Sequence, residues 1–472
     1  MNYDAMVIGS GVVGTATALG MAMKGFKIGI VDQSSSPPNS PRHLSVNKKS
    51  AKFLSSLELW DEVVTSSMPY SKIQVWDREG TGRIEFSSED INEKSLGYII
   101  KEGNLQKGLL NRLQEYDVDF FWSEKLTQMR EDKDSLILYL DSGKKIFSKS
   151  ILGADGLNST VRKLGNFKVK SWSYDQSAIV AQIDSDRDLN GIIKQSFTKY
   201  GPLALLPINK NQMTMIWSID QEKINDFVSL KDEEFIKVLK NEFGEKIYNP
   251  SFSSERIIFP LQHLTAIGFA KKKIALLGDA AHHVHPLAGL GLNSGLGDAE
   301  CLVKLFDSYP AISAESLLKK YNNERLPTNV GLAAAMELFK RGFGNQNIWL
   351  KTFRNSVFKL ENKEKDIVLD ISLKLGKYIT ENLKDVEVIY TRKNDTYPQL
   401  YERTSMANSE KADLFLSIHC DAFQDPSAYG SSSFVLGLNH GNHSRVAIKE
   451  NPIIKTKEDK VNYGNFNINS PE

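Results

Sequence analysis

The chain has 472 residues, of which 41% are hydrophobic and 25% are charged, a composition typical of a globular protein with two or three core-forming units. Lysine and arginine number 59 against 58 acidic residues, so the net charge of +1 supplies neither a basic surface for nucleic acid nor an overall attraction to anionic lipid. The two cysteines, Cys301 and Cys420, fit neither a disulfide framework nor a cysteine-rich zinc site, which favours a reducing compartment and hence the cytoplasm.

The first element in the chain is an uncharged stretch between Asp4 and Lys24 that is long enough to suggest a membrane span. Four glycines interrupt it, an acidic residue precedes it, and neither a basic segment nor a small-residue cleavage site accompanies it. We therefore expect no signal peptide or membrane anchor. The pattern instead predicts a strand over residues 3–8, a helix to about residue 24 and a second strand over 27–31.

A glycine-rich turn between the first strand and the helix suggests a nucleotide site. Gly9, Gly11 and Gly14 form the pattern GxGxxG, and Asp32 closes the next strand. Glycine permits a tight turn and close approach of the backbone to a pyrophosphate, the helix N-terminus offers free N–H groups, and the aspartate can accept hydrogen bonds from an adenosine ribose. Taken alone, the pattern is weak evidence, and a tight turn that binds no ligand is the alternative.

The middle of the chain carries alternating strand patterns. They lie at residues 73–76, 83–86, 136–140, 178–183 and 212–219. Because such runs interrupt the nucleotide-binding segments, they predict a second domain built on a mostly antiparallel sheet. Trp172 and Tyr174 are expected to pack in that sheet rather than to act as catalysts.

A second candidate nucleotide segment is ILGADGLNSTVR, which begins at residue 151. Asp155 and Gly156 follow a predicted strand, and Ser159 and Arg162 begin a predicted helix. A carboxylate in a tight turn at this place can contact a nucleotide, while the arginine supports the loop.

A third segment, LLGDAAHHVHPLAGLGLNSGLGDAE, begins with a predicted strand and leads into a helical pattern that continues to about residue 360. Asp279 follows the strand and can bond a ribityl hydroxyl. Gly289, Gly291 and Asn293 begin the helix, whose N-terminus would stabilise negative charge on a reduced flavin ring.

The third segment also contains His282, His283 and His285, and three histidines so close together suggest a metal site as an alternative. The Gly-Asp turn before them and the proline-glycine run after them assign them to the flavin loop instead. No separate nicotinamide-binding motif is present, and no single catalytic acid or base can be identified from the sequence.

The motifs GxGxxG, GADGxxS and GDAAHxxHPLAGxGLN, in this order, resemble the group A flavoprotein aromatic hydroxylases. PRHLSV, LGYIIKEGNLQKGLL, WSYDQSAIVA, FTKYGPLALLP and FPLQHLTA make the chain similar to the ubiquinone-biosynthesis hydroxylases among them, over about 360 residues. The resemblance implies FAD bound by the motif residues together with Arg42 and Gln106. It also implies NAD(P)H as reductant, O2 as co-substrate, a prenylated phenol or quinol as substrate, and contact with the inner face of the cytoplasmic membrane.

The same resemblance divides the first 360 residues into domains. FAD-binding segments are expected at about 1–70, 98–165 and 270–305, a substrate domain at about 71–97 and 166–269, and C-terminal helices at 306–360. Gly103, Leu290 and Gly297 depart from the family, in which an arginine, a glutamine and an arginine are usual. These departures predict weaker flavin binding or slower turnover.

A new α/β unit is predicted from about residue 361. The segment ENKEKDIVLDISLKLGKYITENL has the pattern of an amphipathic helix, and strands are expected at 386–391 and 413–419. EKDIVLDISLKLGKYI, VIYTRKNDTYPQLYERTSMAN, KADLFLSIHCDA and YGSSSFVLGL resemble the zinc-dependent type 3 N-acetylmuramoyl-L-alanine amidases. That resemblance implies Glu364 and His419 as two zinc ligands.

The expected zinc site is incomplete, because the family's first histidine and its C-terminal glutamate have no counterpart in this chain. An active amidase, an inert remnant and a fusion product without catalytic function are the alternatives, and peptidoglycan is an improbable partner for a chain without an export signal. The expected fold is α/β. It comprises a Rossmann-like FAD-binding domain with an inserted, mostly antiparallel substrate-domain sheet, followed by an incomplete α/β amidase fragment.

Overall fold

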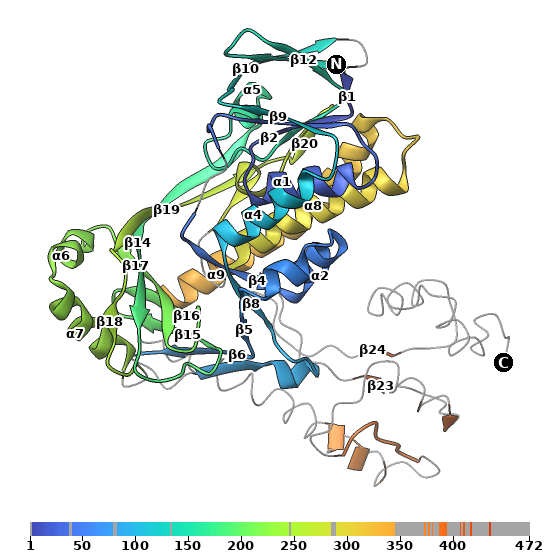
Figure 1. Ribbon diagram of the computed structural model, residues 1–472. Helices are drawn as coiled ribbons and strands as arrows, with labels where there is room; N and C mark the ends of the chain where they lie inside the picture. The colour runs from blue at the N-terminus through green and yellow to red at the C-terminus, as the bar shows by residue number, and fades with distance from the viewer. Residues whose placement is uncertain are drawn as a thin grey trace. The chain divides into compact units, whose positions relative to one another are not determined.

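The computed structural model describes residues 2–344, except 37–39, 79–82, 133–134, 245–246 and 285–288, and several short pieces between 372 and 435 (Figure 1). The chain divides into two compact units, Met1–Asn355 and Ser356–Glu472. Among the described residues, no helix is both long and apolar enough to span a membrane.

A six-stranded sheet forms the centre of the first unit. Its strands, in spatial order, are β20 (Ala270–Lys271), β21 (Ile274–Leu276), β13 (Ile151–Gly153), β2 (Ala5–Ile8), β3 (Ile28–Asp32) and β9 (Val118–Trp122). All neighbouring pairs are parallel except β20 with β21. Strands β2 and β13 are buried along their whole length, as expected of parallel strands covered on both faces.

Helices pack around the two large sheets of this unit. They are α1 (Val12–Ala22), α2 (Lys48–Ser56), α3 (Trp60–Val64), α4 (Glu102–Leu113), α5 (Thr160–Leu164), α6 (Ile224–Ser229), α7 (Asp232–Phe243), α8 (Leu290–Ser308) and α9 (Ala314–Gly344). Helix α1 packs against both α4 and α8 (Figure 1). The close approach to α8 requires glycine at position 295, since a Cβ there would lie only 2.6 Å from Val13 Cγ2.

Two smaller sheets flank the central one. The first contains β1 (Asn2–Tyr3), β12 (Lys145–Ser148), β11 (Ser135–Leu140) and β10 (Leu126–Asp132), and the second contains β4 (His43–Asn47), β8 (Gly97–Lys101) and β5 (Met68–Tyr70). The strand predicted at residues 3–8 is thus divided at Asp4 between β1 and β2, which belong to different sheets.

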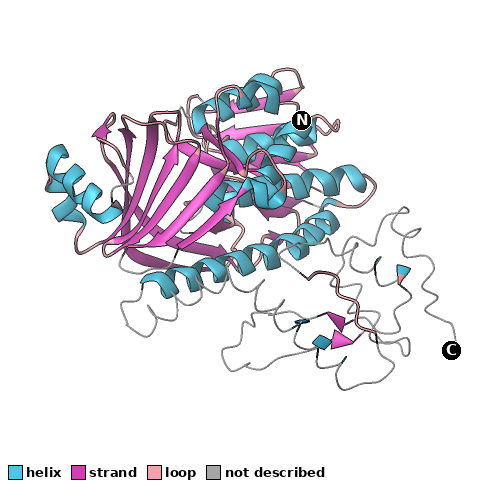
Figure 2. Cartoon of the chain, turned by 90° about the horizontal axis from the view of Figure 1, so that it is seen from below, coloured by secondary structure: helices cyan, strands magenta, loops and turns pink. Residues whose placement is uncertain are grey.

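A nine-stranded sheet, the large array of strands in Figure 2, is inserted between the segments of the central one. Its path is β22 (His282–His283), β19 (Ile257–Ala266), β14 (Val169–Asp184), β17 (Gln212–Asp220), β16 (Gly201–Pro207), β15 (Ile192–Thr198), β6 (Lys72–Asp77) and β7 (Arg83–Ser87), with β18 (Ser251–Phe252) on β14. Every pair is antiparallel except β15 with β6. Trp172 of β14 stacks on His263 of β19, with 3.8 Å between their ring centroids.

The two faces of the nine-stranded sheet bury different cores, because side chains alternate between faces along each strand. On one face Trp217 is fully buried and packs against Phe235 of α7. On the opposite face Leu206 packs with Tyr70 of the three-stranded sheet β4-β8-β5. The predicted α/β fold with an inserted, mostly antiparallel sheet is confirmed.

The helical pattern expected to continue to about residue 360 is interrupted. Helix α8 ends at Ser308, and α9 begins at Ala314. Between them Tyr309 leaves the helical region with φ −136° and ψ 57°, because a following proline, Pro310, disfavours helical backbone at the residue before it.

Only short pieces of the second unit are described. The strand predicted at 386–391 is wrong for residues 387–390, which have no strand conformation in the part of the chain that the structure describes. Within the strand expected at 413–419, β23 (Leu416–Ser417) pairs with β24 (Phe434–Val435). The helix predicted near residue 361 lies largely outside the described residues.

Candidate functional site

Three turns of the first unit lie together. They follow β2, β13 and β21, which are neighbours in the six-stranded sheet. Gly153, the last residue of β13, pairs with Ile8 of β2 and with Leu276 of β21. Because these strands are parallel, the turns emerge at the same edge of the sheet, where ligands of open α/β sheets bind. The structure therefore brings together the three segments that carry the sequence motifs.

The first turn requires glycine at two positions and leaves open space at a third. Gly9 has a φ of +103°, and a Cβ on it would overlap the carbonyl oxygen of Ala154. A Cβ on Gly14 would overlap the carbonyl oxygen of Gly9. Gly11, at the start of α1, has no neighbouring heavy atom within 4 Å of a Cβ placed on it. The N-terminal N–H groups of α1, which have no partner within the helix, thus adjoin space that an anionic group can enter.

Asp32 connects the first turn to the end of β3. Its Oδ2 accepts hydrogen bonds from Ser10 N at 2.7 Å and Ser10 Oγ at 2.8 Å, and its Oδ1 accepts one from Ser34 N at 2.8 Å. Desolvation raises the pKa of Asp32, but these hydrogen bonds to the charged form outweigh it and hold the pKa below the usual value. Asp32 is therefore a fixed, ionised acceptor beside the glycine turn.

Gln106 of α4 donates hydrogen bonds to the same turn. Its Nε2 donates to Ser10 O at 2.5 Å and to Thr15 Oγ1 at 2.9 Å. Its Oε1 is buried and has no hydrogen-bond partner among the described residues. A buried, unsatisfied carbonyl oxygen is costly, so this atom suits a donor supplied by a ligand.

The second turn holds itself together. Asp155 Oδ1 accepts from Ser159 Oγ at 2.5 Å, and Oδ2 accepts from Thr160 N at 2.6 Å and Val161 N at 3.0 Å. Both oxygens thus stabilise the start of α5. Arg162 then links this turn to the third, because its guanidinium donates to Ala280 O at 2.9 Å.

The third turn presents Asp279, whose side chain is about half exposed and lies 3.3 Å from His283 Nδ1. Desolvation raises the pKa of Asp279, but the hydrogen bond to His283 and the positive charges of His283, His282 and Arg42 lower it below the usual value. Arg42 is therefore close to this turn, although its guanidinium also pairs with Glu102, 2.9 Å from Nε to Oε2.

A fully buried carboxylate, Asp298 of α8, fixes the third turn from inside the protein. It accepts hydrogen bonds from Gly278 N at 3.0 Å, His282 Nε2 at 2.6 Å and Arg325 Nε at 2.7 Å. Burial raises the pKa of Asp298, and His282 and Arg325 more than reverse this effect. The Arg325 guanidinium also fills the space beside Gly297, where a Cβ would lie 3.0 Å from its nearest nitrogen.

The start of α8 is joined to β4 through one side chain. Asn293 Nδ2 donates to Ser45 O and to Gly289 O, both at 2.8 Å, and its Oδ1 accepts from Asn47 N at 2.9 Å. Gly289 has a φ of +62°, and Gly291 has open space where a Cβ would lie. An uncapped helix N-terminus with free space beside it can accommodate negative charge.

Sequence analysis did not identify Asp298 or Arg325. An acidic residue within a helical pattern is usually solvent-exposed, and its arginine partner lies on the next helix, 27 residues further along the chain. Only the folded chain brings the two together.

Two histidines of the third segment have partners within the protein. His282 pairs with Asp298 and His283 with Asp279. No group of three or more potential metal ligands occurs among the described residues. His285, Glu364 and His419 lie outside them.

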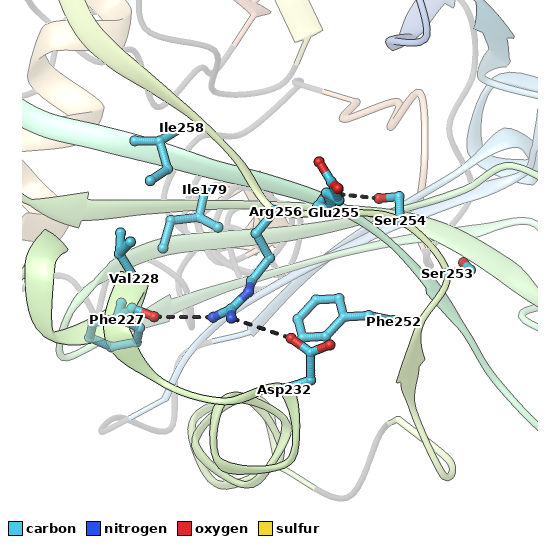
Figure 3. A pocket seen from close by; sticks show the side chains of 10 residues that line it. All are labelled: Ile179, Phe227, Val228, Asp232, Phe252, Ser253, Ser254, Glu255, Arg256 and Ile258. Atoms are coloured by element: carbon cyan, nitrogen blue, oxygen red, sulfur yellow. Dashed lines mark hydrogen bonds and ion pairs between the residues drawn. The ribbon is translucent and has the colours of Figure 1, made fainter.

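A cavity of about 630 Å³ (Figure 3) is lined by no residue of the three turns. Ile179 and Ile258 line it on the sheet face that α6 and α7 cover. At its mouth the Arg256 guanidinium already donates to Phe227 O at 3.1 Å and lies 3.3 Å from Asp232 Oδ1. The cavity is on the opposite face of the sheet from β4 and is therefore not part of this site.

Comparison with known proteins decides the family. Residues 2–336 match the model of the FAD binding domain family, which is more than half of the chain. The chain belongs to this family. It is an FAD-dependent monooxygenase, and its relatives include ubiquinone-biosynthesis hydroxylases. Residues 354–465 match the N-acetylmuramoyl-L-alanine amidase family, so an amidase domain follows the FAD-binding domain.

Curated relatives agree with this assignment, and a solved structure has the same fold. The chain is 29% identical to 3-demethoxyubiquinol 3-hydroxylase of Escherichia coli, over 74% of this chain and 92% of that one. It is 28% identical to the ubiquinone biosynthesis monooxygenase COQ6 of Danio rerio, over 74% and 85%. The fold is also that of PqsL of Pseudomonas aeruginosa, with a TM-score of 0.68 and 18% identity over 76% of this chain and all of that one.

Proposed function

We propose that the first unit binds one FAD across its three turns and hydroxylates a prenylated phenol or quinol, with NAD(P)H as reductant and O2 as co-substrate. The observation that carries this proposal is the convergence of three motif-bearing turns at the ends of three adjacent parallel strands. One extended dinucleotide is the ligand that such a row of turns suits. When bound, FAD supplies the redox chemistry, and the protein positions the substrate and excludes water.

The proposed FAD contacts come from the three turns together with β4 and α4. They are Gly9, Gly11, Gly14, Asp32, Arg42, Gln106, Asp155, Gly156, Asp279, Gly289, Gly291 and Asn293. The pyrophosphate is assigned to the open N-terminus of α1, the adenosine ribose to Asp32 and the ring system to the N-terminus of α8. Asp155 also shapes its own turn, since both of its carboxylate oxygens accept hydrogen bonds there.

The substrate class is supported by the relatives' names and by the sheet face that is turned toward β4. The names of the relatives refer to ubiquinone biosynthesis and to a demethoxyubiquinol. The sheet face that packs toward the three-stranded sheet carries Ile193, Ala204, Leu206 and Ile216. Apolar side chains suit a prenylated ring, and a substrate of this kind lies in a membrane, so we propose that a cytoplasmic chain meets it at the membrane surface.

The experiment begins with the absorbance spectrum of the purified chain. We expect non-covalent FAD near one per chain, and NAD(P)H oxidation that requires O2 and rises when a monoprenylated phenol is added. Asp279→Ala should lower the FAD content, whereas Asp307→Ala, at a surface ion pair of α8 with Lys24, should not. A chain that binds no FAD, or an Asp279→Ala variant with full FAD content, would count against the proposal.

The match of residues 354–465 to an amidase family favours a second candidate function, zinc-dependent cleavage of peptidoglycan. Two proposed ligands, Glu364 and His419, are too few for a catalytic zinc site, which takes three protein ligands and a water. In the sequence, the missing histidine should precede Glu364, and the first compact unit extends to Asn355. We therefore propose that the second unit adds no hydrolase activity.

A further inference from the structure

His43 stands where the FAD-binding part of the first unit meets the nine-stranded sheet. It lies in β4, two residues before Ser45, and alternate residues of a strand share a face. Ser45 is on the side of Gly289, since a Cβ on Gly289 would lie 2.9 Å from Ser45 Cβ. The imidazole of His43 is therefore on the face of β4 that also meets the start of α8.

The partner of His43 is Thr214 of β17. The distance from His43 Nδ1 to Thr214 Oγ1 is 3.2 Å. Thr214 lies between Met213 and Met215, which are buried in the core under α7, so its own side chain is on the opposite sheet face, paired with Leu206. The hydrogen bond thus spans from the flavin-side strand to the apolar sheet face assigned to the substrate.

Burial and a nearby positive charge favour the neutral form of His43. Partial burial and the ammonium of Lys101, its paired residue in β8, lower the pKa of His43 below the usual value. The neighbouring Arg42 is paired with Glu102, and Thr214, from the other side, is uncharged. A neutral imidazole whose Nδ1 is engaged by Thr214 presents Nε2 as its second polar atom.

We propose that His43 is a catalytic residue that accepts the proton of the substrate's ring hydroxyl at Nε2, with Nδ1–H donating to Thr214. The O–H bond of the phenol breaks, an N–H bond forms on His43, and the electron pair stays on the ring oxygen. The negative charge raises the electron density of the ring carbons, which is what an electrophilic oxygen transfer requires. This assignment rests on the proposed function.

The first test uses the FAD-loaded full chain and a nitrophenol, whose phenolate absorbs visible light. We expect the bound ligand to ionise at lower pH in the native chain than in His43→Gln, and Thr214→Val to give an intermediate shift. His263→Gln, in β19 and stacked on Trp172, serves as the matched histidine control and should behave as the native chain. An identical ligand titration in the native chain and in His43→Gln would overturn the assignment.

The second test is the pH profile of kcat/KM with a monoprenylated phenol. His43→Gln should lower kcat/KM about a hundredfold near neutral pH, which is the usual contribution of a general base. The kcat/KM of this variant should recover as rising pH ionises the free phenol. Damage to packing would not be rescued in this way. If the native chain binds no FAD, the proposed function and this inference both fail. If substrate stimulates NAD(P)H oxidation by the native chain and the pH profile of His43→Gln equals the native profile, only the inference fails.

Discussion

The six-stranded and nine-stranded sheets of the first unit use their residues in different ways. In the six-stranded sheet, the site is made by the backbone of turns at strand ends, where Gly9 and Gly14 are required by close contacts. In the nine-stranded sheet, the proposed substrate contacts are side chains that alternate along strands, such as Thr214 beside Met215. A turn that requires glycine produces a recognisable motif in the sequence, whereas side chains that alternate along a strand do not. The difference explains why the cofactor was predicted and the substrate contacts were not.

The largest effect on stability is expected from the buried carboxylate that fixes the third turn. Asp298→Asn leaves Arg325 and His282 buried without their carboxylate and should lower the free energy of unfolding by about 3–5 kcal/mol. Urea unfolding of the FAD-free chain measures this. Asp307→Asn, on the same helix but half exposed, should change stability by less than about 1 kcal/mol. Equal stability of the two variants would refute the role of Asp298.

A matched change in the nine-stranded sheet should separate stability from cofactor binding. Trp217→Phe shortens a fully buried side chain under α7 and should cost about 1–3 kcal/mol. Because Trp217 lies on the face away from β4, the FAD dissociation constant of the folded variant should be unchanged. A weakened FAD affinity, measured by fluorescence titration, would show that the two sheets are more closely coupled than their separate cores indicate.

The turn residues could be predicted because each is required by the local backbone of its turn. The hydrogen-bond network of Asp298, His282 and Arg325 could not. Asp32 and Gln106, which were predicted to contact FAD, both lie beside the glycine turn. Asp298 and Arg325 escaped prediction because their pairing depends on how α8 packs against α9. In the second unit, residues 387–390 were assigned to a strand from their pattern alone, and they are not in a strand.

Acid should weaken the six-stranded sheet through its two ionised aspartates. The pKa values of Asp32 and Asp298 are lowered in the folded chain, so their contribution is present above the unfolded value of about 4 and is lost as pH falls through the folded values. Stability of the FAD-free chain should therefore fall below about pH 4, and less steeply in Asp32→Asn. Parallel curves for the native chain and this variant, from urea unfolding at several pH values, would contradict the assignment.

The smallest effect is expected from removing the second unit. A chain that ends at Asn355 retains the whole first compact unit, so its melting temperature and FAD content should match those of the full chain. The full chain should also hydrolyse no muropeptide and hold no stoichiometric zinc. Muropeptide cleavage that disappears in His419→Ala would show instead that a complete metal site forms.

The most direct test of the central claim is the affinity of Gly11→Ala for FAD. Gly11 has a φ of −66°, and a Cβ on it meets no protein atom within 4 Å, so alanine should leave the melting temperature of the FAD-free chain unchanged. The added methyl group would occupy the space assigned to the pyrophosphate and should raise the FAD dissociation constant about tenfold or more. Gly331→Ala, whose position in α9 also offers open space, should bind FAD as the native chain does. Native affinity in Gly11→Ala would mean that the dinucleotide does not lie at the N-terminus of α1.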